Sequence, residues 1–180
     1  MRIFLVGFMG AGKTTVGRKL ARKLDHDFYD TDHVFEEKFR YTIYNFFEHF
    51  GEDMFRKLEY GVLQDLIRNT SDVVISTGGG TPCFYDNMDI MNRSGITVYL
   101  TMHKSSLKQR LIRSKRPRPA LKGMSEEHME KYIDELLDRR ESYYSLARIT
   151  VKGENCNVDD LCREIVDLGN ANGHKAGGVG

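Results

Sequence analysis

Short apolar runs alternate along this chain with longer stretches in which apolar and polar positions recur at helical spacing. The apolar runs have the length of buried strands, and they are Ile3–Val6, Phe28–Asp30, Val73–Thr77, Thr97–Thr101 and Ile149–Lys152. The helical patterns cover residues 13–24, 31–39, 52–69, 84–93, 104–113, 125–143 and 157–168. Strands that alternate with helices favour a parallel sheet covered on both faces. We therefore predict an α/β fold with three layers and a five-stranded parallel sheet.

The same pattern sets the expected limits of the domain. Residues 1–168 show no long linker and no internal repeat, so we predict a single domain there. The stretch 169–180 is rich in Gly, Ala and Asn and has no apolar period, which predicts a flexible tail. Residues 113–124 are basic and contain Pro117 and Pro119, which cannot continue a helix. This segment is either a solvated charged loop or a lid over a phosphate site.

The most informative motif is G-x-x-x-x-G-K-T, which runs from Gly7 to Thr14. It follows the first apolar run and opens an amphipathic helix, as a phosphate-binding P-loop does. Gly7, Gly10 and Gly12 permit backbone conformations in which the N–H groups surround an anion. Lys13 can reach the terminal phosphates, and the Thr14 hydroxyl can ligate Mg²⁺. The alternative is a glycine-rich turn with an incidental lysine, which the strand-to-helix context disfavours.

Two aspartates, Asp30 and Asp32, follow the second predicted strand. Because ligands bind at the carboxyl ends of parallel strands, both carboxylates should lie near the P-loop. On an extended segment, residues two apart point the same way. One carboxylate could then hold the Mg²⁺ hydration shell and the other could orient an acceptor hydroxyl. The alternative is that Thr31 or Asp32 only caps the helix that follows.

An arginine and a run of glycines add candidates for binding an acceptor. Arg56 is suited to gripping a carboxylate through two hydrogen bonds, although it could also form an exposed helical pair with Glu59. The third predicted strand leads into Gly78, Gly79 and Gly80. Three consecutive glycines indicate a backbone that approaches a ligand and donates N–H groups. The alternative is a floppy loop.

Taken in order, these motifs resemble the shikimate kinase family, within the P-loop kinases that are like nucleoside-monophosphate kinases. The resemblance rests on G-F-M-G-A-G-K-T-T-V-G, D-T-D, G-E-x-x-F-R-x-x-E, the G-G-G after V-I-S-T, R-P-A-L and an R-x-x-x-Y near residue 140. It covers residues 1 to about 168. It implies strand order 2-3-1-4-5 and the transfer of phosphate from ATP to the 3-hydroxyl of shikimate, a step of chorismate and aromatic amino-acid synthesis.

The resemblance also implies a role for each matching residue. ATP would contact Gly10, Ala11, Gly12, Lys13, Thr14, Thr15, Arg110 and Arg118, and Mg²⁺ would be held by Thr14 and Asp30. The acceptor would contact Asp32, Arg56, Gly78, Gly79, Gly80 and Arg140, with the arginines on its carboxylate. The catalytic residues would be Lys13, Asp32 and the lid cation Arg118. Phe47 and Phe55 would line the ring pocket, or simply belong to the core.

The chain departs from the family pattern near two of these residues. Arg140 is followed by Glu141-Ser142 where a proline is usual, and Arg139 is its neighbour, so either arginine could grip the carboxylate. The lid contains an additional Arg-Pro at Arg116, so either Arg116 or Arg118 could be the lid cation.

Composition narrows the partners. The 180 residues carry a net charge of +1, with a pI of about 7.7, which gives no basic field for nucleic acid or membrane. The three cysteines form no C-x-x-C pair, and the histidines show no metal-ligand spacing. The first strand follows the N-terminus directly and leaves no room for a signal peptide. We expect a cytoplasmic monomer that uses ATP and Mg²⁺.

Two rival functions remain open at this point. One is a related small-molecule kinase, such as a gluconate kinase, and the other is a nucleotide-dependent regulator without an acceptor pocket. The absence of N-K-x-D counts against a GTP switch.

Overall fold

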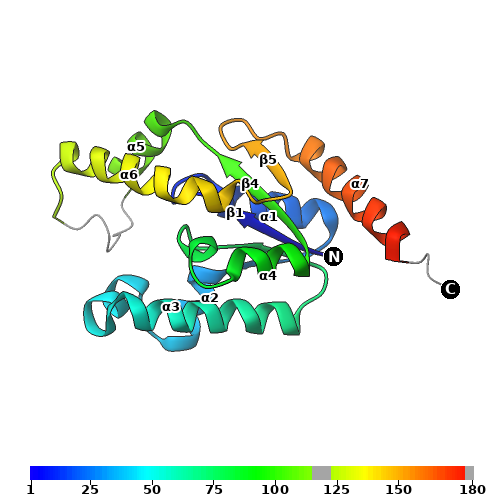
Figure 1. Ribbon diagram of the computed structural model, residues 1–180, viewed down its shortest axis with the longest axis horizontal. Coiled ribbons are helices and arrows are strands. Elements are labelled where there is room, and N and C mark those ends of the chain that lie inside the picture. The colour runs from blue at the N-terminus through cyan, green and yellow to red at the C-terminus, as the bar shows by residue number, and fades with distance from the viewer. Residues whose placement is uncertain (115–122, 177–180) are drawn as a thin grey trace.

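A twisted parallel sheet forms the centre of the computed structural model, which describes residues 1–114 and 123–176 (Figure 1). Its strands are β1 (Arg2–Val6), β2 (Asp27–Asp30), β3 (Val73–Ser76), β4 (Ile96–Thr101) and β5 (Ile149–Lys152). Their order is β2-β3-β1-β4-β5, and every pairing in this described sheet is parallel. The predicted fold class and strand order are therefore confirmed.

Helices cover both faces of this sheet. They are α1 (Lys13–Leu24), α2 (Thr31–Phe39), α3 (Ile43–Asn69), α4 (Asn87–Ser94), α5 (Lys104–Ile112), α6 (Glu126–Tyr144) and α7 (Val158–Ala176), with a short 3₁₀ turn η1 at Thr81–Cys83. From β1 the chain runs toward the β2 edge of the sheet, whereas from β3 it runs toward the β5 edge. Right-handed crossovers therefore place α1 on the face opposite α3 and α4. Helix α7 contacts α1, whereas η1 lies among α3, α4 and α6.

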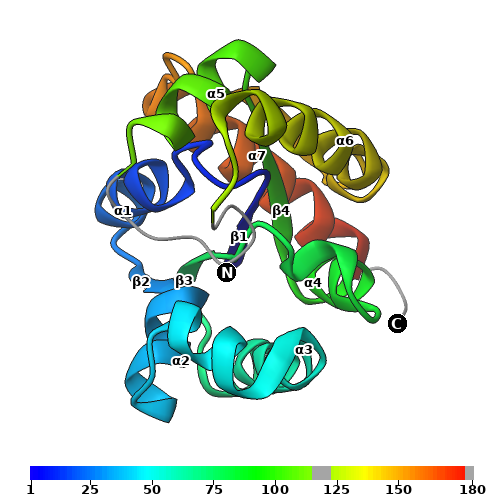
Figure 2. The same ribbon diagram turned by 90° about the vertical axis from the view of Figure 1, so that its left-hand side faces the viewer.

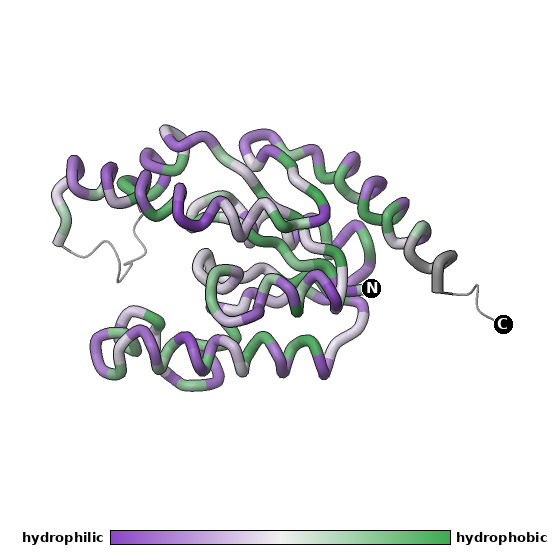
Figure 3. The backbone as a smooth tube through the Cα atoms, viewed as in Figure 1, coloured by the Kyte–Doolittle hydropathy of each residue, from purple (hydrophilic) through white to green (hydrophobic). Residues whose placement is uncertain are grey.

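The core lies where the central strands meet these helices. Residues Ile3–Val6 of β1 and Val73–Ser76 of β3 are all buried, as expected for strands covered on both faces. Strand β2 lies at the edge of the sheet and is only half-buried. The helices are amphipathic, and in Figure 3 the turns of α7 alternate between hydrophobic and hydrophilic colours.

Helix α3 begins earlier than the predicted helix at 52–69. The Thr42 side chain caps it by accepting a hydrogen bond from the Asn45 N–H, 3.2 Å away. Gly51, at φ 77°, interrupts the helix with a kink. A glycine with positive φ ends one stretch of helix and allows another to begin. The segment 43–50 is therefore too short for its helical periodicity to be recognised from the sequence.

The prediction that regular structure ends at residue 168 is wrong, because α7 continues to Ala176. Gly169 lies inside the helix, and a Cβ built there would be 3.2 Å from Met1 Sδ and 3.9 Å from Ile96 Cδ1. A small residue therefore lets the helix pass closely over the chain start. Low apolar content does not stop a helix that is already nucleated by an amphipathic segment.

Candidate active site

Those predicted site residues that the structure describes come together at the carboxyl ends of β1, β2 and β3. Figure 2 looks toward this edge, with α2 and α3 on one side and α5 and α6 on the other. Asp30 ends β2 opposite Ser76 at the end of β3, and the N–H of Thr77 reaches back to Leu5 O of β1 at 3.1 Å. The loops that leave these strands therefore start side by side, which is the usual ligand crevice of an open α/β sheet.

The P-loop has the conformation that its glycines predict. Gly7, Gly10 and Gly12 have φ values of 135°, 84° and 98°, in the region that favours glycine. A Cβ at Gly7 would lie 2.7 Å from Leu100 O, so this position also lacks space for a side chain. Lys13 begins α1, as predicted, and its ammonium group donates to Gly7 O at 2.8 Å and to Phe8 O at 2.9 Å.

The remaining residues of the nucleotide side surround this loop. The Ala11 N–H donates to Phe8 O at 3.2 Å, and the Thr15 side chain is exposed at the start of α1. Arg110 from α5 donates to Gly10 O at 3.1 Å. Arg110 thus lies against the rim of the loop, close to where a bound nucleotide would pass.

Thr14 and Asp30 form a pair that suits Mg²⁺. The Thr14 hydroxyl donates to Asp30 Oδ2 at 2.7 Å, and both side chains offer oxygen atoms beside the P-loop. Mg²⁺ in nucleotide sites commonly takes one or two protein oxygens and completes its shell with water and phosphates. Among the described residues no cluster of three or more His, Cys, Asp or Glu side chains could hold a metal alone. The pair therefore fits a metal that arrives with a nucleotide.

The two aspartates do not lie on one extended segment, so that part of the prediction is wrong. Asp30 ends the strand and is the N-cap of α2, because its Oδ1 accepts the Asp32 N–H at 3.1 Å. Asp32 lies in the first turn of α2, and its Oδ1 would be 2.8 Å from a Cβ on Gly78. Capping is thus done by Asp30, while the Asp32 carboxylate faces the glycine loop.

Arg56 lies in a buried network rather than in the exposed helical pair considered from the sequence. Its Nη1 donates to Glu59 Oε2 at 2.8 Å, and Thr81 Oγ1 donates to Glu59 Oε1 at 2.6 Å. Its Nε and Nη2 donate to Glu52 Oε1 at 3.1 and 2.9 Å. Burial lowers the pKa of Arg56, but attraction to Glu59 and the hydrogen bonds to both glutamates outweigh it and raise the pKa. The cation is therefore permanent.

Aromatic side chains of the core lie near Arg56, and several aromatic rings contact its guanidinium. Phe55 is buried and packs on Phe35 with ring centroids 4.9 Å apart, as a core residue does. The Arg56 guanidinium also lies 5.1 Å from the Phe55 ring, 6.0 Å from the Phe47 ring and 4.1 Å from the Phe84 ring. These aromatic contacts hold the guanidinium plane in place.

The three glycines after β3 form a tight, engaged loop rather than a floppy one. The Gly78 N–H donates to Thr31 Oγ1 at 2.9 Å. A Cβ on Gly79 would lie 2.9 Å from the Met9 N atom, and one on Gly80 would lie 2.6 Å from Arg56 Nη2. The backbone thus passes between the P-loop and Arg56, which only glycine permits.

Of the two neighbouring arginines on α6, Arg140 faces this loop. Its guanidinium lies 5.9 Å from the Phe8 ring. Burial raises the pKa of both Cys83 and Tyr144, and the Arg140 charge opposes that rise in each case. Burial has the larger effect on the Cys83 thiol, whose pKa rises to about 11 although Arg140 and Arg56 oppose the shift. Arg139 instead donates to Glu135 O at 3.3 Å and is exposed. Arg56 and Arg140 therefore flank one thiol, and Arg139 points elsewhere.

Several residues of this arrangement were not predicted from the sequence. Tyr144, fully buried, donates its hydroxyl to Gly79 O at 2.5 Å. Glu59 and Thr81 complete the network around Arg56. The only sequence signal for them is spacing, since F-R-x-x-E places Glu59 one helical turn after Arg56 and R-x-x-x-Y places Tyr144 one turn after Arg140. The predicted lid cations Arg116 and Arg118 lie outside the described residues.

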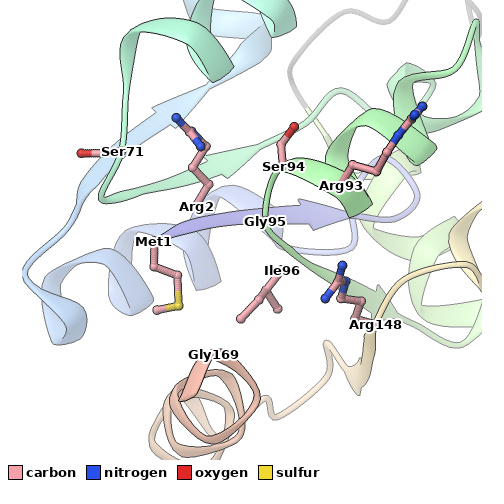
Figure 4. A pocket seen from close by; sticks show the side chains of 9 residues that line it. All are labelled: Met1, Arg2, Ser71, Arg93, Ser94, Gly95, Ile96, Arg148 and Gly169. Carbon is pink, nitrogen blue, oxygen red and sulfur yellow. The ribbon is translucent and has the colours of Figure 1, made fainter. Parts of the chain in front are cut away.

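A hollow of about 530 Å³ lies at the amino ends of the strands, opposite the ends that carry the site (Figure 4). None of the predicted site residues lines it. It is lined by Arg2, Arg93 and Arg148 among others. Arg2 Nε donates to Thr70 O at 2.8 Å and Arg148 Nη2 to Asn92 O at 2.6 Å, at the ends of α3 and α4. Cations at helix C-termini are stabilising, so these arginines serve the fold.

Within the described part of the chain, no helix is both long enough and apolar enough to cross a membrane.

Comparisons with known proteins agree with this fold. A model of the shikimate kinase family matches residues 9–169. The chain is 42% identical over 165 residues to the shikimate kinase of Azobacteroides pseudotrichonymphae, covering 92% of this chain and 97% of that one. The crystal structure of shikimate kinase from Bacteroides thetaiotaomicron superposes with a TM-score of 0.84 at 40% identity, over 93% of this chain and 97% of the other. Shikimate kinase from Acinetobacter baumannii in complex with shikimate gives 0.83 at 38% identity, over 95% and 93%.

Proposed function

This chain belongs to the shikimate kinase family, and from that premise we propose how its residues carry out the reaction. The protein is an enzyme that phosphorylates shikimate with ATP. The phosphoryl group goes to the 3-hydroxyl and yields 3-phosphoshikimate and ADP, a step toward chorismate and the aromatic amino acids. Phosphoryl transfer asks mainly for alignment and neutralisation of charge. Each residue below serves one of these two ends.

The nucleotide side neutralises charge. The N–H groups of Gly10 and Gly12 and the start of α1 at Lys13 bind the phosphates of ATP, with Ala11 part of the same loop. Lys13 leaves the carbonyls of Gly7 and Phe8 for the terminal phosphates. Thr14 and Thr15 follow in the first turn of α1, and Arg110 lies beside the nucleotide. A further cation for the transferring group would be Arg118 or its neighbour Arg116, which both lie outside the described residues.

Thr14 and Asp30, whose side chains meet at 2.7 Å, would hold Mg²⁺. When bound there, the metal would neutralise negative charge on the phosphates during transfer. The Asp30 carboxylate also caps α2, the helix that contains Asp32. One side chain therefore contributes both to the metal site and to the placement of Asp32.

The acceptor side provides alignment. Arg56 and Arg140 bind the shikimate carboxylate, since the charges of both act on Cys83 in η1, which follows the glycine loop. Asp32 accepts hydrogen bonds from the ring hydroxyls and takes the proton from the attacking oxygen. Gly78, Gly79 and Gly80 bring the backbone against the ring. The single observation that carries this proposal is the pair of arginines whose charges both act on Cys83, directly after the glycine loop, because a carboxylate-bearing acceptor is what two such cations select.

We further propose that the enzyme acts as a monomer on small molecules, with neither nucleic acid nor membrane as partner. The balanced charge supports this proposal. A cytoplasmic location is proposed because the reaction consumes ATP.

A turnover assay with shikimate, gluconate and no acceptor, each with ATP, tests the proposal. Rapid ADP release is expected in the presence of shikimate and in neither of the other two reactions. Turnover with gluconate would favour a related sugar kinase, and nucleotide binding without turnover would favour a regulator.

Titration calorimetry then tests the acceptor residues. Arg56→Ala and Arg140→Ala should each weaken shikimate binding by about 2–5 kcal/mol while ATP binding persists. Arg139→Ala is the matched control. Loss of shikimate binding in Arg139→Ala, with normal binding in Arg140→Ala, would reverse the assignment.

A further inference from the structure

The backbone donors of the glycine loop are not equivalent. The Gly78 N–H is already bound to Thr31 Oγ1. The carbonyls of Gly78 and Gly80 accept hydrogen bonds from the N–H groups of Thr81 and Cys83, at 3.2 and 2.9 Å. In the described part of the chain, the N–H groups of Gly79 and Gly80 have no such partner. Since backbone donors beside a crevice are rarely left unpaired, these two are the donors available to a ligand.

One of these two donors belongs to a peptide unit that is held from behind. The peptide between Gly79 and Gly80 contains the Gly79 carbonyl and the Gly80 N–H, which point in opposite directions because a trans peptide is planar. The Tyr144 hydroxyl binds that carbonyl at 2.5 Å. Fixing the carbonyl fixes the direction of the Gly80 N–H, which faces away from Tyr144.

Tyr144 also lies on the same helix as the second arginine of the acceptor side. Arg140 precedes it by one turn of α6, and its charge acts on the Tyr144 hydroxyl. Helix α6 and the glycine loop come from distant parts of the chain. The hydroxyl of Tyr144 is therefore a direct link between the element that presents Arg140 and the peptide that presents the Gly80 N–H.

We propose that Tyr144 is a positioning residue for the acceptor. Its hydroxyl orients the Gly79–Gly80 peptide so that the Gly80 N–H and the Arg140 guanidinium meet the same acceptor molecule. The inference rests on the proposed function, in which Arg140 binds the acceptor carboxylate. Without the hydroxyl, the peptide can rotate and the N–H is no longer aimed at the ligand.

The test is the substitution Tyr144→Phe, with Tyr99→Phe and Tyr143→Phe as controls. Tyr99 is a control for stability, since it is buried, packs on Tyr144 with ring centroids 5.2 Å apart, and donates its hydroxyl to Glu141 Oε2 of the same helix at 2.6 Å instead of to the glycine loop. Tyr143 is exposed and controls for the chemical change alone.

In Tyr144→Phe the KM and the calorimetric Kd for shikimate should rise about three- to tenfold, as for the loss of one buried hydrogen bond. The KM for ATP should stay unchanged, and both controls should keep the wild-type KM for shikimate. An unchanged KM for shikimate in Tyr144→Phe would overturn the inference, as would an equal rise in Tyr99→Phe, which would mean general loosening of α6. Arg140→Ala separates a failure of the proposed function from a failure of this inference. If Arg140→Ala leaves shikimate binding intact, the assignment of Arg140 to the acceptor fails. If it abolishes binding while Tyr144→Phe has no effect, only the role of Tyr144 fails.

Discussion

Glu52 occupies the part of Arg56 that a substrate carboxylate would need. One carboxylate oxygen of Glu52 accepts from both Nε and Nη2, while the remaining guanidinium nitrogen is bound to Glu59. The Glu59 side chain is 4% exposed and also held by Thr81, whereas the Glu52 side chain is 51% exposed. If Arg56 binds shikimate as proposed, Glu52 is the partner that leaves.

The magnitude of this competition follows from exposure. A half-exposed pair at i, i+4 on a helix contributes about 0.3–1 kcal/mol. Binding shikimate must give up that amount, so Glu52→Gln should bind shikimate about two- to fivefold more tightly than the wild type, by the usual conversion of 1.4 kcal/mol per tenfold. Thermal stability should fall only slightly, because Glu59 still pairs with the buried cation.

Titration calorimetry with shikimate decides the matter. Asp53→Asn is the matched control, because it removes the same charge from the neighbouring exposed position of α3. Affinity equal to the wild type is expected there. Weaker shikimate binding in Glu52→Gln would refute the reasoning, since it would mean that Glu52 orients Arg56 for the substrate instead of competing with it.

Three further outcomes are expected. Lys13→Ala should abolish turnover with a normal melting temperature, because the charge on the transferring phosphoryl loses its main protein cation; near-normal rates in a steady-state assay would disprove this. Asp32→Asn should keep ATP affinity and lose about 10²–10⁴-fold in kcat; full activity with a lower melting temperature would make Asp32 a structural residue only. Burial favours the neutral Cys83 thiol, so its stabilising effect is complete below pH 9 and is lost as the pH rises to about 11. The free energy of unfolding, measured with urea, should therefore decline over this pH range, and the decline should be smaller in Cys83→Ala. Identical pH profiles for the wild type and Cys83→Ala would contradict the raised pKa of Cys83.

The strands and the P-loop could be predicted from the sequence because their signals are local. Residues 3–6 and 73–75 are apolar throughout because both faces of the sheet are covered. The glycines at 7, 10 and 12 have positive φ because the loop itself requires it. Local chemistry and final structure agree at these positions.

The rest depends on contacts between distant residues. The burial of Arg56 could not be predicted from α3 alone, because Thr81 of η1 binds its partner Glu59 and Gly80 of the glycine loop lies against the guanidinium. The choice between Arg139 and Arg140 required the rotation of α6 against η1. Asp30 was assigned to the metal alone, but the helix that starts directly after it also uses its carboxylate as a cap.

The contacts of Lys13 have a consequence for the rates of nucleotide exchange. Its ammonium group holds the carbonyls of Gly7 and Phe8, so the loop is cross-linked by its own side chain before any phosphate arrives. The conformational entropy of ordering the loop is lost during folding and not during association. Different nucleotides should consequently associate at similar rates, and discrimination among them should be expressed in residence time.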